Sequence, residues 1–180
     1  MIENCFPPAW QHRGQTVKVW GKDSTGLIEY QFNQQGFRSR IDYTTKADWA
    51  FFGNSIVFGV GVHLDRILAS QFDNSQNYGL SGSYMNHHSV TNFLRFISTP
   101  LYASSTKIVF FWIERDEPLA EMSQEVNKHV PNVLHISSGK KISGMINLMP
   151  SLDKDVSGTH PGPLTHKMWA KTIRLLFRDR

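Results

Sequence analysis

The chain has 180 residues, of which 40% are hydrophobic and 19% charged, and its formal net charge at pH 7 is +4. This hydrophobic share excludes a disordered chain, and the length suits one domain or one domain with a short arm. No dense basic run accompanies the positive charge. The nearest approach to one lies at Lys171, Arg174, Arg178 and Arg180. We interpret these residues as a solvated helix end whose positive charges complement the helix dipole, rather than as a phosphate or nucleic-acid patch. We therefore expect no nucleic-acid partner.

Cysteine content and hydropathy narrow the class further. Cys5 is the only cysteine, so we expect no internal disulfide and no thiolate metal site. The first residues lack the basic and then apolar regions of a signal peptide, and no stretch approaches the roughly eighteen apolar residues of a membrane span. We therefore expect a cytoplasmic protein without a membrane partner. Its oligomeric state does not follow from the sequence.

The first part of the chain differs in pattern from the rest. Apolar residues recur in residues 17–20 and 28–32, and a turn-like Lys-Asp-Ser-Thr-Gly cluster at residues 22–26 separates the two runs. This pattern predicts two short strands joined by a turn. We expect residues 1–42 to form a β-hairpin arm and residues 43–180 to form the main domain.

From residue 47 onward, strand patterns alternate with helix patterns. Strands are predicted at residues 49–52, 76–79, 107–113 and 133–136. Apolar residues at helical spacing predict helices near residues 64–68, 92–97, 118–126 and 163–177. The alternation indicates an α/β sheet with right-handed crossovers.

Residues 53–59, Gly-Asn-Ser-Ile-Val-Phe-Gly, follow the first predicted buried strand. Ligands of open α/β sheets bind beyond the carboxyl ends of the strands, so Ser55 is placed to present its hydroxyl to a ligand. The segment is not a G-x-S-x-G elbow, because Val57 occupies the position of the second glycine, and it matches neither a P-loop nor a dinucleotide fingerprint. On spacing alone, a turn or capping serine is the simpler interpretation.

Residues 157–163, Ser-Gly-Thr-His-Pro-Gly-Pro, precede the last predicted helix. A loop rich in glycine and proline places His160 at the surface, where it can act as the general base for a serine. Taken by itself, His160 is more simply an exposed loop histidine. The adjacent His87 and His88 lack a third ligand at a known spacing and face opposite ways in an extended segment, so we expect no metal site.

Taken together, the two segments resemble the SGNH, or GDSL-type, superfamily of esterases and lipases. Residues 53–59 are similar to the first block of the family, with Asn54 in place of the usual aspartate and Ser55 at the nucleophile. Residues 77–82, Asn-Tyr-Gly-Leu-Ser-Gly, resemble the second block, whose last glycine is Gly82 here. The resemblance implies that the N–H groups of Ser55 and Gly82 line an oxyanion hole.

The resemblance extends from about residue 47 to the C-terminus. His160 matches the histidine of the last block, and residues 164–170 resemble the continuation seen in carbohydrate-directed members. Asn33 with Gly-Phe-Arg at residues 36–38 resembles a lead-in of some polysaccharide-associated relatives. The family implies a three-layer, flavodoxin-like α/β/α domain with a central, mostly parallel sheet. It also implies a serine ester hydrolase without a cofactor, such as an O-acetyl esterase, with a small-molecule or carbohydrate ester as substrate.

Two blocks depart from the family pattern. Arg115 follows the long predicted strand at the position of the asparagine of the oxyanion hole. We expect its guanidinium to donate to the oxyanion, to fill the hole, or to bind an anionic ligand. Ser157 occupies the position of the aspartate that orients the histidine, so Asp155 or a backbone carbonyl is expected to hold the His160 ring instead.

Three functions therefore stay open. Ser55, Gly82 and His160 favour a hydrolase that forms an acyl-enzyme. Arg115 and Ser157 favour a catalytically degenerate domain that binds a glycan or an anionic ligand. An O-acyltransferase has the same nucleophile and excludes water from the second step.

Overall fold

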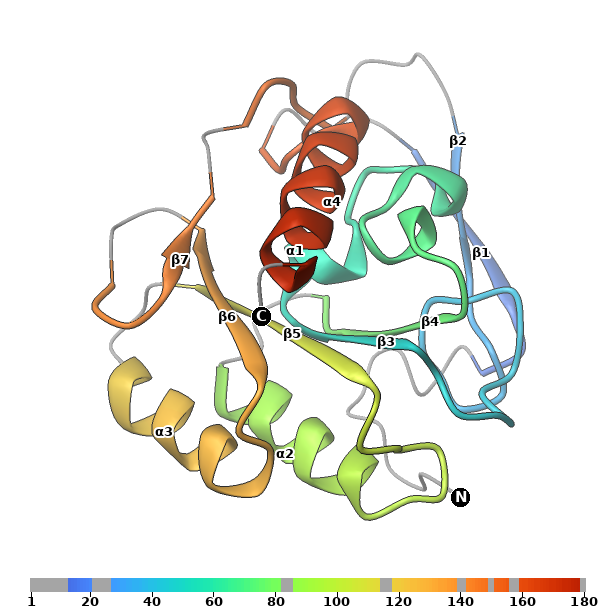
Figure 1. The fold of residues 1–180 in the computed structure, drawn as a ribbon. Coiled ribbons are helices and arrows are strands. Elements are labelled where there is room, and N and C mark those ends of the chain that lie inside the picture. The colour runs from blue at the N-terminus through green and yellow to red at the C-terminus, as the bar shows by residue number, and fades with distance from the viewer. Residues whose placement is uncertain are drawn as a thin grey trace.

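The computed structural model describes residues 13–20, 27–81, 86–113, 118–138, 142–148, 151–155 and 159–178. None of the helices within these residues combines the length and the hydrophobicity that a membrane span requires. The described chain contains a two-stranded antiparallel sheet and a five-stranded parallel sheet (Figure 1).

The parallel sheet has the strand order β4-β3-β5-β6-β7. Its strands are β3 (Trp49–Gly53), β4 (Ser75–Gly79), β5 (Lys107–Ile113), β6 (Val133–Ser138) and β7 (Ile146–Asn147). Counted from β3, this is the doubly wound order 2-1-3-4-5 of flavodoxin-like folds. The predicted α/β class and parallel sheet are therefore confirmed.

Helices cover both faces of the sheet. Helices α2 (Asn86–Ile97) and α3 (Leu119–His129) lie on one face, and α1 (Ser55–Phe58) and α4 (Pro163–Arg178) lie on the other (Figure 1). Because side chains alternate along a strand, β3 and β5 supply both cores. Phe52 and Phe110 belong to the core beneath α2 and α3, and Phe51 and Phe111 to the core beneath α4. The result is the predicted three-layer architecture.

The predicted N-terminal hairpin is also present. Strands β1 (Thr16–Trp20) and β2 (Leu27–Gln31) pair antiparallel, whereas the predicted turn at residues 22–26 lies outside the described residues. A further turn at residues 32–38 follows β2, closed by an antiparallel bridge between Phe32 and Arg38. We call β1, β2 and this turn the β arm.

The segment between the β arm and β3 covers the outer edge of the sheet. The hydroxyl of Tyr43 donates to the carbonyl of Asn77 at 3.1 Å and accepts the N–H of Asn77 at 2.8 Å. One buried side chain therefore satisfies the backbone groups of edge strand β4 that another strand would otherwise pair with.

Some predicted elements differ from the structure. Two short 3₁₀ turns, η2 (Leu64–Arg66) and η3 (Ala69–Gln71), replace the helix predicted near residues 64–68. Ile67, between the two turns, has an extended backbone and therefore interrupts the predicted helix. Its side chain lies directly against Gly59. Helix α2 begins at Asn86, six residues before its predicted start. Strand β7 was not predicted, because two residues show no periodicity.

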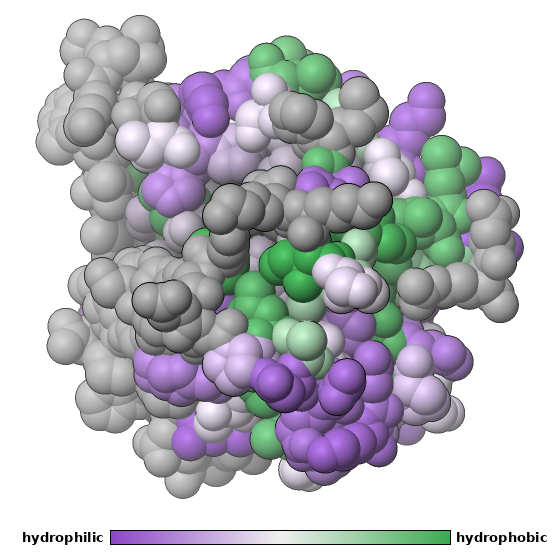
Figure 2. All heavy atoms as spheres, turned by 90° about the vertical axis from the view of Figure 1, so that its left-hand side faces the viewer, coloured by the Kyte–Doolittle hydropathy of each residue, from purple (hydrophilic) through white to green (hydrophobic). Residues whose placement is uncertain are grey.

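Figure 2 views the molecule from the β7 side. Hydrophobic atoms gather near the middle of this face, and a strongly hydrophilic area lies below them. Ile146, in β7, and Ile142, four residues earlier, are only half-buried. On the opposite edge, β4 is covered by the segment that contains Tyr43.

Candidate active site

A sharp turn at the end of β3 places Ser55. Gly53 has a φ of 151°, and a Cβ atom there would lie 2.8 Å from the carbonyl oxygen of Phe111. Only glycine fits such a position. The next side chain, that of Asn54, accepts the N–H of Ile56 at 2.9 Å and caps α1. Ser55 is therefore the first residue of α1, half-buried just beyond the carboxyl end of β3.

Ser55 lies at the switch point of the sheet. Strand β3 has β4 on one side and β5 on the other, so the connections that leave β3 and β4 run in opposite directions across the sheet. Ligands of doubly wound folds bind at this crevice. Gly82 and Arg115 belong to the connections after β4 and β5, but both lie outside the described residues.

His160 is brought to Ser55 from a hairpin in front of α4. Its Nε2 atom lies 3.1 Å from the Oγ atom of Ser55, across 105 residues of sequence. The N–H of Asp155 donates to the carbonyl of His160 at 2.9 Å, and Lys154 forms an antiparallel bridge with Pro161. These contacts close the hairpin. The imidazole keeps 29% of its surface exposed, so an incoming ligand can reach it.

Asp155 is buried beneath the same hairpin. Its Oδ1 atom accepts the backbone N–H groups of Thr159 at 3.1 Å and His160 at 3.0 Å. Its Oδ2 atom lies 3.7 Å from Nδ1 of His160. The hydroxyl of Thr159 lies closer, 3.0 Å from the same nitrogen. The structure thus brings Ser55, His160 and Asp155 together and adds Thr159, which no sequence pattern had indicated.

The groups next to Nδ1 bear on which ring nitrogen of His160 carries the proton. An ionised carboxylate only accepts hydrogen bonds, and a hydroxyl oxygen can accept one as well. Asp155 therefore favours a proton on Nδ1, and the Thr159 hydroxyl, which can donate or accept, is compatible with it. Nε2 then presents its lone pair to the hydroxyl of Ser55. In this tautomer the imidazole can accept the serine proton.

Asp153 anchors the start of α4. Its carboxylate accepts the N–H groups of Leu164 at 2.9 Å and Thr165 at 2.8 Å, and the hydroxyl of Thr165 at 2.6 Å. Burial alone would raise the pKa of Asp153, but the bonds from Thr165 and Leu164 outweigh it and hold the pKa below the ordinary 3.8. The His160 hairpin is thereby fixed to α4.

His166 is a buried histidine at the start of α4. Only 1% of this residue is exposed, and burial lowers the pKa of its imidazole to about 4, although a hydrogen bond to the carbonyl of Pro161 opposes the shift. His166 is therefore neutral near pH 7.

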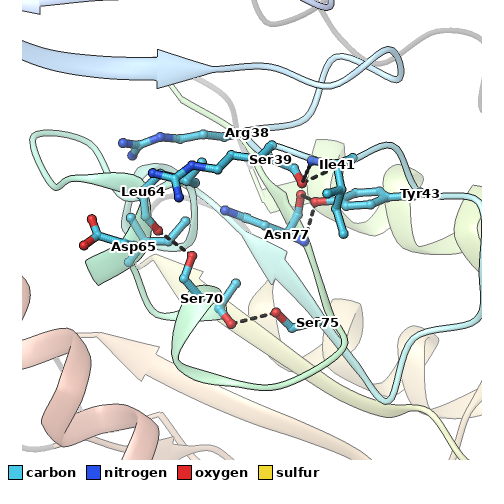
Figure 3. Close-up of a pocket in the computed structure, with 12 residues that line it drawn as sticks. Arg38, Ser39, Ile41, Tyr43, Leu64, Asp65, Ser70, Ser75 and Asn77 are labelled. Carbon is cyan, nitrogen blue, oxygen red and sulfur yellow. Dashed lines mark hydrogen bonds between the residues drawn. The ribbon is translucent and has the colours of Figure 1, made fainter.

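A cavity of about 360 Å³ lies between the segment after the β arm and the η2–η3 loop, and neither Ser55 nor His160 lines it (Figure 3). The hydroxyls of Ser70 and Ser75, which line it, donate to the backbone carbonyls of Leu64 and Ala69. Among the described residues, no histidine lines the cavity. It therefore lacks the pairing of serine with a base that characterises the end of β3.

Among the residues that the structure describes, no group of three or more histidine, cysteine, aspartate or glutamate side chains could hold a metal ion. His87 and His88 lie on α2, not in the extended segment predicted for them, and their ring centroids are 4.0 Å apart.

No protein-family model, curated protein or solved structure matches the chain.

Proposed function

We propose that the protein is a serine ester hydrolase in which Ser55 is the nucleophile and His160 the general base. The observation that supports this most strongly is the 3.1 Å contact between Nε2 of His160 and Oγ of Ser55 at the switch point of the sheet. A capping or turn serine needs no histidine at this distance. The partly exposed ring and the Nδ1 neighbours suit the same chemistry.

The reaction has two steps. His160 takes the proton of Ser55 as Oγ attacks the carbonyl carbon of the ester, which gives a tetrahedral intermediate. The C–O bond to the alcohol then breaks, and the alcohol leaves with the proton from His160. Water attacks the acyl-enzyme with His160 again as base, and Ser55 is regenerated as the acid departs.

The negative charge on the tetrahedral oxygen needs hydrogen-bond donors. The N–H of Ser55 belongs to the first turn of α1, where no helical carbonyl can accept it. We assign this N–H to the oxyanion hole, together with the N–H of Gly82 and the guanidinium of Arg115. Removing one donor of such a hole typically lowers turnover by about 10²–10³.

The resemblance to SGNH hydrolases supports the same roles for Ser55 and His160. In place of the family aspartate, three residues before the histidine, we assign the orienting role to Asp155, which precedes His160 by five. A carbohydrate ester as substrate rests on the resemblance alone. Transfer of the acyl group to an acceptor alcohol would use the same pair of residues, so the test includes such an acceptor.

The proposal is tested by the hydrolysis of p-nitrophenyl esters of increasing chain length and of acetylated sugars, with and without an acceptor alcohol. We expect turnover that falls at least about 10³-fold in Ser55→Ala and in His160→Ala. Ser70→Ala, which alters a serine of the separate cavity, should leave turnover unchanged. Equal turnover in Ser55→Ala and the unaltered protein, or no turnover of any ester, would contradict the proposal.

A further inference from the structure

We infer that Arg38 of the β arm is a positioning residue for the Ser55–His160 pair, so that the arm belongs to the catalytic unit. This inference rests on the proposed function for its kinetic test. One loop, residues 59–62, joins the contacts of Arg38 to both partners of the pair.

The turn at residues 32–38 places Arg38 in the interior of the protein. The N–H of Asn33 donates to the carbonyl of Phe37 at 2.9 Å, and the side-chain oxygen of Asn33 accepts the N–H of Phe37 at 2.9 Å. Gly36 provides the positive φ of 84° that the turn requires. Arg38 at its end is 1% exposed. In Figure 3 its side chain runs between the β arm and the loop that carries Leu64.

The guanidinium binds the end of the short helix that begins with Ser55. Nη1 of Arg38 donates to the carbonyl of Phe58 at 3.0 Å and to that of Gly59, and Nη2 donates to the carbonyl of Val62. Helix α1 is a single turn, which is unstable by itself and leaves its last carbonyls without helical donors. Arg38 supplies these donors and a positive charge at the C-terminal end of the helix.

Tyr30 reinforces the same loop. The guanidinium lies 4.2 Å from the centre of the Tyr30 ring, and the hydroxyl of Tyr30 accepts the N–H of Gly61 at 2.8 Å. Gly61 in turn lies against Asp155, since a Cβ atom at Gly61 would be 2.0 Å from Oδ2 of Asp155. Residues 59–62 therefore touch the β arm, continue from the Ser55 helix and border the carboxylate beneath His160.

Arg38 occupies this place without a carboxylate partner. No ion pair joins it to any acidic residue in the described ranges. Burial lowers the pKa of its guanidinium to about 10, with the Tyr30 interaction opposing the shift. A buried charge is costly, and an apolar side chain of similar length would fill the same space without that cost. Three convergent carbonyls, however, require several donors in one plane, which guanidinium provides.

The kinetic test compares Arg38→Ala with Arg40→Ala on the substrate that the hydrolysis assay identifies. Arg40 is an exposed arginine two residues away, with its Nε 3.0 Å from the side-chain oxygen of Gln31. We expect Arg38→Ala to lower kcat by about 10–100-fold with little change in KM, because the reacting groups move and the substrate contacts do not. Arg40→Ala should match the unaltered protein.

Chemical rescue separates positioning from a general loss of folding. Guanidinium ions, added far below denaturing concentrations, should restore part of kcat in Arg38→Ala, whereas the same ionic strength of sodium chloride should not. Arg38→Lys should retain more activity than Arg38→Ala. Equal kcat in Arg38→Ala and Arg40→Ala, or a loss of kcat in Arg38→Ala that guanidinium does not relieve and that the lost folded fraction explains, would overturn the inference.

A measurement without turnover keeps this inference separable from the proposed function. The Nδ1–H signal of His160 in proton–nitrogen NMR reports the hydrogen bonds of the ring even in an inactive protein. We expect the signal to persist in Arg40→Ala and to broaden or disappear in folded Arg38→Ala. An unchanged signal in Arg38→Ala would overturn the positioning role, whether or not the protein hydrolyses esters.

Discussion

Gly61 and Asp155 lie so close together that a Cβ atom on Gly61 would sit 2.0 Å from Oδ2 of Asp155. The same oxygen lies 3.7 Å from Nδ1 of His160. A side chain at position 61 would therefore push against the carboxylate that faces the imidazole. This links the loop after the Ser55 helix directly to the acid beneath His160.

Gly61→Ala should accordingly impair turnover more than stability alone explains. Gly144 is a matched control, because its φ of 77° resembles the 70° of Gly61 but no atom would lie within 4 Å of its Cβ. Both variants should lose about 1–2 kcal/mol from the backbone conformation. We expect only Gly61→Ala to lower kcat, by tenfold or more at temperatures where both variants are folded. Equal kcat in the two variants would contradict the prediction.

Asp155→Asn tests the orienting acid. Its amide oxygen can keep the bonds from the N–H groups of Thr159 and His160, but its NH₂ group would then face Nδ1 and favour the opposite tautomer of His160. We expect kcat to fall by about 10²–10⁴, as the comparable change in a serine protease costs about 10⁴. Asp153→Asn, which weakens the anchor of α4, should lower the unfolding temperature instead. A large loss of kcat in Asp153→Asn together with an unchanged kcat in Asp155→Asn would rule out this role for Asp155.

Thr159→Val removes the hydroxyl that lies 3.0 Å from Nδ1 of His160 while preserving the shape of the side chain. Because the carboxylate of Asp155 still faces the ring, we expect a smaller loss in kcat, within about tenfold and about the value of one neutral hydrogen bond. The steady-state rates of Thr159→Val and Asp155→Asn check the ranking. A larger loss in Thr159→Val would make the hydroxyl the principal partner of Nδ1.

His166 makes stability depend on pH between about 4 and 6.5. The pKa of this imidazole is about 4 in the folded protein and 6.5 in the unfolded chain, so between these values the unfolded chain binds a proton that the folded protein does not. The free energy of unfolding is therefore highest, as far as His166 is concerned, above pH 6.5. It falls as the pH drops towards 4 and below, by a total on the order of 3 kcal/mol. Asp153, with its pKa below 3.8, contributes a loss only at lower pH.

Urea unfolding at several pH values measures this dependence. We expect His166→Gln to flatten the curve between pH 4 and 6.5, whereas substitution of the exposed His63 should leave the slope unchanged. An equal slope in His166→Gln and the unaltered protein would show that other groups are responsible.

Tyr43→Phe tests the protection of the sheet edge. Loss of the hydroxyl leaves the N–H and carbonyl of Asn77 without this partner. We expect the free energy of unfolding to fall by about 1–3 kcal/mol and aggregation to increase. Tyr102→Phe is the control, because the Tyr102 ring packs on Phe96. Equal stability and solubility of the two variants would contradict the prediction.

The elements with the strongest local patterns were predictable. The apolar run at residues 107–113 coincides with β5, and the periodic segment from residue 163 ends within one residue of α4. The pairing of Ser55 with His160 was anticipated through the resemblance of two motifs. Periodicity alone cannot bring together residues so far apart in sequence.

Other features depend on contacts that no local pattern encodes. The single arginine in the turn after β2 gives no sequence signal for its bonds to carbonyls some twenty residues later. Thr159 was missed because its role depends on the direction in which the hairpin presents Nδ1. The interruption of the predicted helix near Ile67 depends on the approach of Gly59, which is likewise a tertiary contact.

The most direct measurement of the Ser55–His160 mechanism is labelling with a fluorophosphonate probe, followed by mass spectrometry of the modified peptide. We predict labelling at Ser55 that vanishes in Ser55→Ala and falls steeply in His160→Ala, because the probe reacts with a serine activated by a base. Absence of labelling at Ser55 in the folded protein, or labelling that persists unchanged in His160→Ala, would contradict an activated serine.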